Sequence, residues 1–294
     1  MKTIELVTGK FFRALNYLIM LILIIVCVYP FYYVFIISVS NSSSAFGSVF
    51  LLPNSFDFTT YKAIFRDNSV WNALFISVSR TVIGMLVTLF VCSLFGYLMS
   101  KQFFMKTVIY RFVLITMYFN AGLIPYYLTI KNYHLTDNFL VYILPAALSG
   151  FNVILIKTFI EQIPPSLEES AFIDGASLFQ VFCRIIIPVS KPILATIAVF
   201  SAVGQWNSYM DNYLFVHNEL LQTLQLKLYL LLTEAQSMAS KAARSDYTNM
   251  NNAQLTPTTV RMTITVITTL PILLVYPFMQ KFFVSGIMLG AVKG

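Results

Sequence analysis

The chain has 294 residues, of which 58% are hydrophobic and only 11% are charged. A soluble domain carries about a quarter of charged residues, so this composition excludes an ordinary soluble globular protein. The net charge of +7 comes from lysines and arginines beside apolar runs, without a basic patch interleaved with aromatic side chains, so a nucleic-acid-binding role is not needed to explain it.

Six apolar runs along the chain are long enough to cross a bilayer, because a helix needs roughly 20 apolar residues to span about 30 Å of hydrocarbon. The first run is too long for the core of a signal peptide and lacks a small-residue cleavage site behind it, so we expect it to be retained. The sequence therefore predicts an all-α membrane protein with one transmembrane domain over residues 1–294. The predicted spans lie near 15–40, 72–99, 108–130, 138–160, 192–216 and 258–280.

The positions of the basic residues predict the orientation, because lysine and arginine are more frequent in cytoplasmic loops. With the N-terminus inside, eleven of the nineteen lie on the cytoplasmic side, and three of the other eight lie in the long outer loop 217–257, which counts little. Both termini and the segment 161–190 are therefore predicted to be cytoplasmic. The eleven are Lys2, Lys10, Arg13, Lys101, Lys106, Arg111, Lys157, Arg184, Lys191, Lys281 and Lys293.

The segment 161–188 reads EQIPPSLEESAFIDGASLFQVFCRIIIP and predicts a first short helix. Pro164 and Pro165 can start it, since proline costs little in a first turn. Leu167 and Ala171 lie one turn apart and give the helix a small apolar face. A merely solvated loop would leave these apolar positions exposed to water.

A second short helix is predicted to follow the first. Gly175 can stop the first helix, and Ser177 can cap the next one. The sequence LFQVFCRIII can then continue as a helix to a break at Pro188. The segment is thus expected to consist of two short helices that meet at a glycine.

This segment resembles the EAA loop by which the permease subunits of ATP-binding-cassette (ABC) importers contact their ATPases. It reads Glu-Ser-Ala at 169–171, where the family has Glu-Ala-Ala, then Asp-Gly at 174–175, and Ile-Pro at 187–188, where the family has Leu-Pro. The two departures, serine for alanine and isoleucine for leucine, are small changes at packed positions. The resemblance implies that the loop couples the chain to an ATPase through Glu168, Glu169, Ala171, Asp174, Gly175, Ile187 and Pro188.

Three further stretches look like the maltose-type carbohydrate permeases, especially the branch for oligosaccharides and polysaccharide fragments: MYFNAGLIPYYLTI at 117–130, WN at 206–207 and FFVSGIMLGAVKG at 282–294. The likeness implies a type I ABC importer permease fold in a bacterial cell membrane, with six transmembrane helices and cytoplasmic EAA coupling helices. In this family the C-terminal tail also reaches the ATPases, which adds Gly286, Gly290 and Gly294 as candidate contacts.

The same resemblance implies a set of partners. These are a homologous second permease, two ATPase subunits that bind ATP and magnesium, an external solute-binding protein and a carbohydrate substrate. The outer loop 217–257 could face the solute-binding protein or could simply be solvated.

Polar residues inside the spans indicate where a sugar would pass, because polar groups are costly against hydrocarbon and should face the interior or a subunit interface. Trp206 and Tyr209 could stack on a pyranose ring, while amides and Asp211 bind its hydroxyls. Aromatic side chains also gather at membrane interfaces, so the aromatic belt is an equal alternative for Trp206. The candidate pathway residues are Asn120, Tyr126, Asn152, Gln205, Trp206, Asn207, Tyr209 and Asp211.

Other functional classes find little support in the residues. The two histidines lie at outer span ends, the three cysteines are scattered and no phosphate-binding loop is present, so we expect no enzyme, metal site or cofactor of the chain's own. A secondary transporter would need paired ionisable groups and repeated halves, whereas Arg80, Lys157 and Asp211 have no evident partner in the sequence. An ABC importer permease for a solute other than a sugar is the main alternative.

Overall fold

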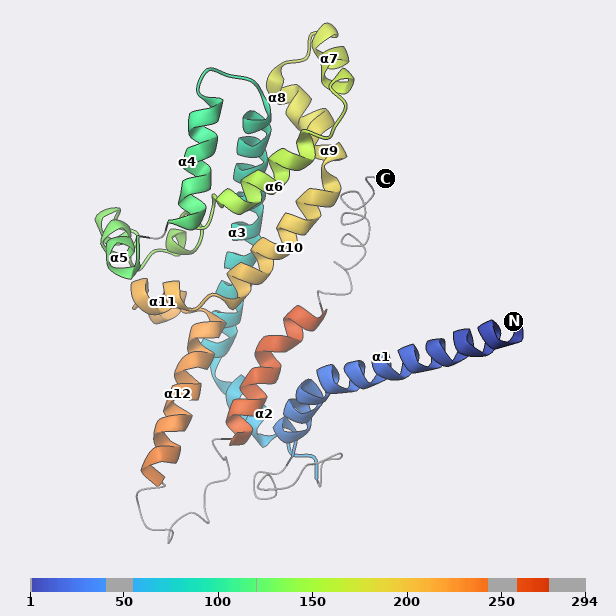
Figure 1. Cartoon of the computed structure of the whole chain (residues 1–294). Helices are drawn as coiled ribbons and strands as arrows, with labels where there is room; N and C mark the ends of the chain where they lie inside the picture. Colours follow the sequence, from blue (N-terminus) through green and yellow to red (C-terminus); the bar gives the residue numbers. More distant parts are fainter. Residues whose placement is uncertain (1, 41–54, 120, 243–257, 275–294) are drawn as a thin grey trace. The chain divides into compact units, whose positions relative to one another are not determined.

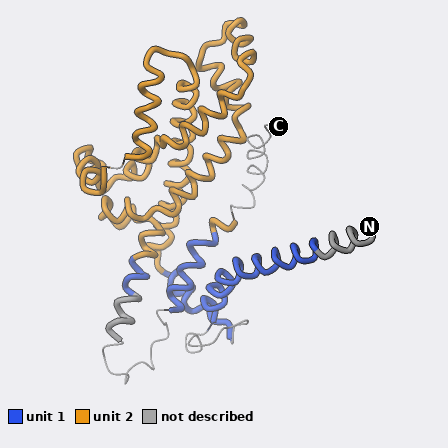
Figure 2. Tube along the Cα trace, in the orientation of Figure 1, with its two compact units in different colours: residues 1–66, 230–270 blue, residues 67–229, 271–294 orange. Residues whose placement is uncertain are grey.

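The computed structural model describes residues 2–40, 55–119, 121–242 and 258–274. These residues form helices and connecting loops, and the β-structure among them is an isolated antiparallel bridge between Ser40 and Phe56. The all-α class predicted from the sequence is therefore confirmed. The chain divides into two units, coloured differently in Figure 2: residues 1–66 with 230–270, and residues 67–229 with 271–294.

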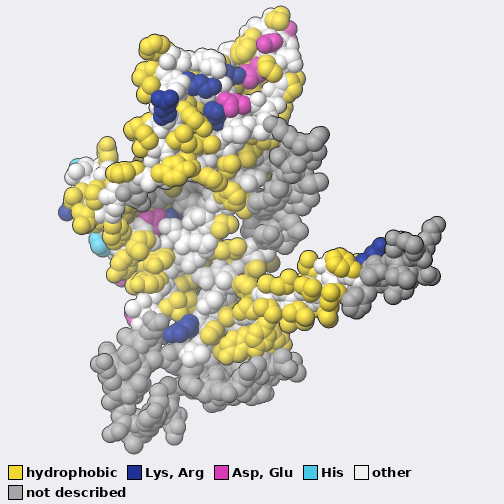
Figure 3. All heavy atoms as spheres, in the orientation of Figure 1, with side chains coloured by type: hydrophobic (Ala, Val, Ile, Leu, Met, Phe, Trp, Pro, Cys, Tyr) yellow, Lys and Arg dark blue, Asp and Glu magenta, His cyan; other side chains and the backbone are white. Residues whose placement is uncertain are grey.

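The first unit contains the long helix α1, Lys2–Ser38, and the short helix α2, Thr59–Arg66 (Figure 1). The part of α1 from Phe12 onward is apolar and long enough to cross a membrane. Hydrophobic side chains cover much of its visible surface in Figure 3, as lipid contact requires. Its end is held by polar contacts: the hydroxyls of Ser38 and Tyr61 lie 2.8 Å apart, and the Thr263 hydroxyl donates to the Ser38 carbonyl at 3.3 Å.

The second unit is built around α3, Asn68–Ser100, which Asp67 caps by accepting the Ser69 amide at 2.9 Å. The helices α6, Gly150–Ile160, and α10, Lys191–Asn207, pack along α3. Two glycines of α3 allow this close approach. A Cβ atom at Gly84 would lie 2.7 Å from the Gln205 amide nitrogen, and one at Gly96 would lie 3.0 Å from Ile156.

Several predicted spans are interrupted in the structure. The run 108–130 forms two helices, α4, Lys106–Tyr118, and α5, Leu123–Asn132, which begins after Gly122 at φ +84°. The run 192–216 forms α10 and α11, Met210–Phe215, with a break at Ser208. Gly122 directly precedes α5 and adopts its positive φ at little cost, so this glycine marks the first break in the sequence.

The run 138–160 holds only one α-helix. A short 3-10 helix, η2, covers Phe139–Tyr142, turns follow, and α6 begins at Gly150. Pro145 lies in the turns, where it cannot donate a helical hydrogen bond. The last predicted span corresponds to the helix Thr258–Leu274. By length and composition, the described residues contain two helices able to cross a membrane, or up to four if each bent pair counts as one span.

Two further elements complete the described chain. The 3-10 helix η4, Glu219–Leu221, leads into α12, Leu224–Ala242. The Asn212 side chain fixes the chain between η4 and α12, because its oxygen accepts the Thr223 amide at 2.7 Å. The Ser77 hydroxyl then accepts the Leu224 amide at 2.8 Å, which ties the start of α12 to α3.

Candidate functional site

The segment between α6 and α10 folds as two short helices joined by a glycine turn. α7, Ser166–Ile173, starts directly after Pro165, and α8 covers Leu178–Val181. Gly175 lies between them at φ +81°, a left-handed conformation that glycine adopts at little cost. The helix start and the glycine stop lie where the sequence predicts them.

The second helix is capped as predicted from Ser177. The Ser177 hydroxyl accepts the Gln180 amide at 3.3 Å, and the Gln180 side chain accepts the Ser177 amide at 2.8 Å. These reciprocal bonds form a capping box, which satisfies two N–H groups at the helix start. The turn between α7 and α8 is therefore defined by hydrogen bonds on both sides of Gly175.

The predicted helix break at Pro188 is wrong. The chain continues from α8 through a π-helical turn, η3, Phe182–Ile186, into α9, Ile187–Val189. Pro188 lies in the first turn of α9, where its missing N–H costs little, so the helical path passes it. The bend of 82° to α10 comes only at Ser190.

The tip of α7 exposes both acidic and apolar side chains. Glu169 and Asp174 are exposed, and Ile173 is 86% exposed. A hollow of about 430 Å³ lies beside Gly175 and is lined on its other side by Arg184. An exposed isoleucine beside acids and a hollow is a surface suited to a protein partner.

Glu168 points to partners within the chain instead. Its carboxylate forms an ion pair with Lys101 at the end of α3 and accepts a hydrogen bond from the Tyr97 hydroxyl at 3.2 Å. A cluster of buried apolar side chains lies beside α3, and the coupling candidates Ala171 and Ile187 pack against it. The coupling candidate Pro188 is exposed. The tail candidates Gly286, Gly290 and Gly294 lie outside the described residues.

A second candidate site is a cavity of about 530 Å³ between the helices of the second unit. Four of the predicted pathway residues line it: Tyr126, Asn152, Gln205 and Asp211. Arg80, Tyr142, Ser149, Ser201 and Ser208 add polar groups to its wall. A concave site with a few convergent polar groups is the usual form of a small-molecule site.

Arg80 organises one wall of this cavity. Its side chain is 2% exposed, and its five N–H donors make five hydrogen bonds. Two go to the Gln205 side-chain oxygen at 3.0 and 3.1 Å, one to the Ser208 carbonyl at 3.2 Å, and two to the Asp211 carboxylate at 2.5 and 3.3 Å. The guanidinium also lies 4.4 Å from the centre of the Tyr142 ring. The charge of Arg80 is thus fully engaged inside the protein.

The structure corrects the expectation that the ionisable residues of the spans lack partners. Arg80 pairs with Asp211 from a helix 131 positions away in sequence, and Lys157 pairs with Glu161 at 2.7 Å. An unpaired buried charge is far more costly than a paired one, so an arginine in one apolar run and an aspartate in another should have indicated this contact. Sequence reasoning also missed Tyr142, which lies in a run with no periodic signal.

Three other predicted pathway residues, Trp206, Asn207 and Tyr209, do not line the cavity. Trp206 lines a separate apolar hollow of about 300 Å³, and Asn207 is exposed. Tyr209 stacks on Tyr229 with ring centres 4.8 Å apart. Asn120 is outside the described residues.

The loop before η2 is fixed by a carboxylate. Asp137 accepts the backbone amides of His217 at 2.5 Å and Asn218 at 2.9 Å. These two hydrogen bonds, Asn218 first, lower the pKa of the Asp137 carboxyl, because they favour its charged form. The charged carboxylate therefore joins the loop after α5 to the loop after α11.

Metal and disulfide chemistry are not indicated. Within the described ranges, no group of three or more His, Cys, Asp or Glu side chains could hold a metal ion. Cys27, Cys92 and Cys183 are free, and only Cys92 is buried.

Known proteins that are similar in sequence to this chain indicate its family. The polygalacturonan/rhamnogalacturonan transport system permease protein YtcP of Bacillus subtilis is 37% identical over 246 residues, which cover 83% of this chain and 84% of YtcP. Protein LplC of the same organism is 38% identical over 248 residues, covering 84% of this chain and 82% of LplC. No family model matches the chain.

A solved structure shares the fold. The crystal structure of a bacterial ABC transporter involved in the import of the acidic polysaccharide alginate contains a chain that is 31% identical, with a TM-score of 0.81, covering 94% of this chain and 98% of that one. The two short helices around Gly175, the helical fold and these relatives agree. The chain therefore belongs to the permease subunits of ABC importers for carbohydrates.

Proposed function

We propose that the chain forms half of the transmembrane pathway of an importer for an oligosaccharide that contains acidic sugars. A second, homologous permease supplies the other half, an external solute-binding protein delivers the sugar, and two ATPase subunits drive the transport. The permease is not an enzyme, since ATP and magnesium bind to the separate ATPases. The observation that carries this proposal is the exposed pair of short helices around Gly175, in a chain related to sugar permeases.

In this proposal the chain crosses a bacterial cell membrane six times. The interrupted helices α4–α5 and α10–α11, and η2 with α6, each complete one crossing, and the other subunits or the pathway would shield their non-helical parts from lipid. Both termini and the loop between α6 and α10 then lie in the cytoplasm, where ATP is available. The basic residues near Lys101, Lys106 and Lys157 support this orientation.

The coupling contact is proposed to lie at α7, Gly175 and α8. Exposed Glu169 and Asp174 offer negative charge, and exposed Ile173 offers an apolar anchor, to a groove of the ATPase. Movement of this groove on ATP binding would then move the two short helices together. The proposed coupling set is Glu168, Glu169, Ala171, Asp174, Gly175, Ile187 and Pro188, with the tail glycines Gly286, Gly290 and Gly294 as a second contact.

The sugar is proposed to pass along the cavity beside Arg80. Tyr126 can lie against a pyranose ring, and Asn152, Gln205 and Asp211 can bind hydroxyls. Trp206, Asn207, Tyr209 and Asn120 complete the proposed pathway where the second permease closes it. The names of YtcP and of the alginate importer suggest acidic sugars as the substrate class. An importer for another solute is the alternative.

Reconstitution tests the proposed function. The purified permease pair with its ATPases, placed in vesicles, should take up a labelled uronic-acid oligosaccharide only when the solute-binding protein is outside and ATP is on the ATPase side. Uptake that needs neither ATP nor the solute-binding protein would indicate a secondary carrier. Uptake of a non-sugar solute alone would support the alternative.

The pathway predicts different results for Asn152, which lines the cavity from α6, and for the residues of α10 that do not line it. Asn152→Ala removes the hydrogen bond that we propose between the Asn152 side chain and a sugar hydroxyl. This loss costs on the order of 1 kcal/mol, so the half-saturating sugar concentration should rise several-fold. Basal ATPase activity and complex assembly should remain, and both are measured in the reconstituted complex. Trp206→Ala and Asn207→Ala are the comparison: lost assembly would place them at the subunit interface, and lowered uptake with intact assembly would keep them in the pathway. An unchanged half-saturating concentration for Asn152→Ala would contradict the proposed path.

A further inference from the structure

The last turn of α3 and the first turn of α7 are joined by a compact polar contact. Lys101 and Tyr97 both bind the same carboxylate oxygen of Glu168, and the Lys101 ammonium lies 4.6 Å from the centre of the Tyr97 ring. Only 13% of the Glu168 side chain is exposed, against 31% for Lys101. We call Glu168, Lys101, Tyr97 and Phe182 the α3 brace.

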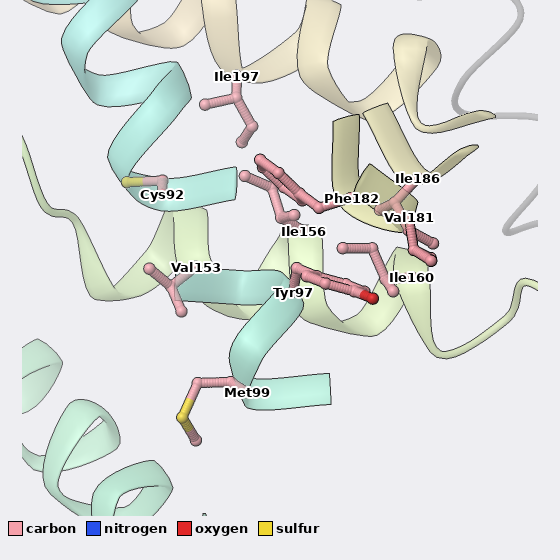
Figure 4. Packing of buried hydrophobic residues seen from close by; sticks show 10 residues of the cluster. All are labelled: Cys92, Tyr97, Met99, Val153, Ile156, Ile160, Val181, Phe182, Ile186 and Ile197. Carbon is pink, nitrogen blue, oxygen red and sulfur yellow. The ribbon is translucent and has the colours of Figure 1, made fainter. Parts of the chain in front are cut away.

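Phe182 extends the brace to the start of η3, directly after the second short helix. The Tyr97 side chain is buried and stacks on the Phe182 ring, with ring centres 5.4 Å apart and planes 28° apart. Figure 4 shows Tyr97 beside Ile160 and Phe182 within the apolar cluster, with its hydroxyl at the cluster edge. One end of α3 therefore contacts α7 through a carboxylate and the π-helical turn η3, directly after α8, through a ring.

Neighbouring acids on α7 have different surroundings. Successive residues of a helix point about 100° apart, so Glu168 faces α3 while Glu169 faces solvent. Among the described residues Glu169 makes no ion pair. Glu161 is also paired, but with Lys157 at 2.7 Å and Lys106 at 3.6 Å, before α7 begins. Dark blue and magenta side chains gather in this part of the second unit in Figure 3.

The same helix reaches the cavity. Arg80 and Lys101 both belong to the α3 region, and their separation of 21 positions corresponds to roughly 32 Å of helix. Arg80 holds Gln205 and Asp211 at the cavity wall. A displacement of α3 along its axis would therefore move the contacts of Arg80 together with those of Lys101.

From these contacts we infer that Glu168 is a positioning residue that fixes α7 to α3, so that a movement of α7 reaches the cavity through α3. This inference rests on the proposed function, in which the ATPases move α7. Glu168 acts through Lys101 and Tyr97 and not by touching the ATPase, which is the task of exposed Glu169.

Charge exchange provides the test. In the reconstituted importer, Glu168→Gln and Lys101→Glu should each lower the number of sugar molecules imported per ATP hydrolysed at least five-fold, while the ATPases stay bound. The exchange Lys101→Glu with Glu168→Lys should recover at least half of the wild-type ratio, and Lys101→Arg should keep it. Glu161→Gln is the matched control and should leave the ratio unchanged.

Two results would overturn the inference. One is a normal ratio in Glu168→Gln; the other is loss of the ATPases from Glu168→Gln but not from Lys101→Gln, which would place Glu168 in the ATPase contact. Hydrogen exchange of the α7 amides gives a readout without transport: Glu168→Gln should accelerate exchange in 166–173, and unchanged exchange would also overturn the inference. Failure of the proposed function would appear separately, as a wild-type complex that imports no sugar.

Discussion

Arg80→Leu is expected to abolish uptake and to destabilise the permease by about 3 kcal/mol, the lower end of the cost of breaking a buried ion pair. The leucine would leave the Asp211 carboxylate charged and without its guanidinium, and it would free the Gln205 side chain from α3. The lower end applies because 18% of the Asp211 side chain is exposed. Thermal unfolding of the purified complex, with uptake in vesicles, measures both effects.

A double-mutant cycle separates the ion pair from the volume of the side chain. Asp211→Asn alone should also destabilise the protein, because it leaves the buried guanidinium without an anion. Arg80→Leu combined with Asp211→Asn should cost less than the sum of the single variants, since no charge is then left unpaired. Arg66→Leu, an exposed position at the end of α2, is the matched control and should change stability by less than about 1 kcal/mol. Additive effects would mean that Arg80 acts through packing alone.

The turn between α7 and α8 could be predicted from sequence because its signals are local. A proline at a helix start, a glycine at its end and a serine cap act within a few residues, and each lies in the structure where the pattern indicates. The predicted break at Pro188 is wrong because a new helical segment, α9, starts after η3. Pro188 lies in its first turn, where the missing N–H costs little. Signals that act within a few residues can therefore be predicted from the sequence, whereas the way one helical turn changes the effect of a proline in the next cannot.

The cavity could be predicted only in part. Polar residues of the spans indicated Asn152, Gln205 and Asp211, all of which line it. An arginine and an aspartate in apolar runs indicate that each needs a partner, but the alignment that joins them depends on helix packing across 131 positions, which no periodicity in a single sequence encodes. Helix packing also decides which face of α10 meets the cavity. Gln205 lines the cavity, whereas the next residue, Trp206, lines an apolar hollow.

α3 connects the cavity with the segment of α7 and α8. It carries Arg80 at the cavity and ends at the ion pair of Lys101 with Glu168. Gly84 and Gly96 let α10 and α6 lie close against it, so a shift of α3 must be shared by both neighbours. A permease that alternates between two states needs such rigid connections, because packed helices move as bodies.

Gly175→Val is expected to leave the permease inserted and folded but to uncouple ATP hydrolysis from sugar uptake. At φ +81° a β-branched side chain is strained, by on the order of 1–3 kcal/mol, and the strain is relieved if the turn between α7 and α8 changes shape. Nothing lies within 4 Å of a Cβ atom at this position, so the effect would come from the backbone and not from a clash. Uptake should fall at least ten-fold while ATP hydrolysis continues, both measured in vesicles at equal permease content.

Gly175→Asn provides the matched comparison, because asparagine tolerates the left-handed region far better than valine. If the shape of the turn transmits the motion, asparagine should retain most of the uptake and valine should lose it, although both add a side chain at the same exposed place. Equal losses in the two variants would show that the ATPase needs the space beside Gly175 and not its conformation. Normal uptake in both would remove the turn from the coupling contact, and the exposed face around Glu169 and Ile173 would then have to act without it.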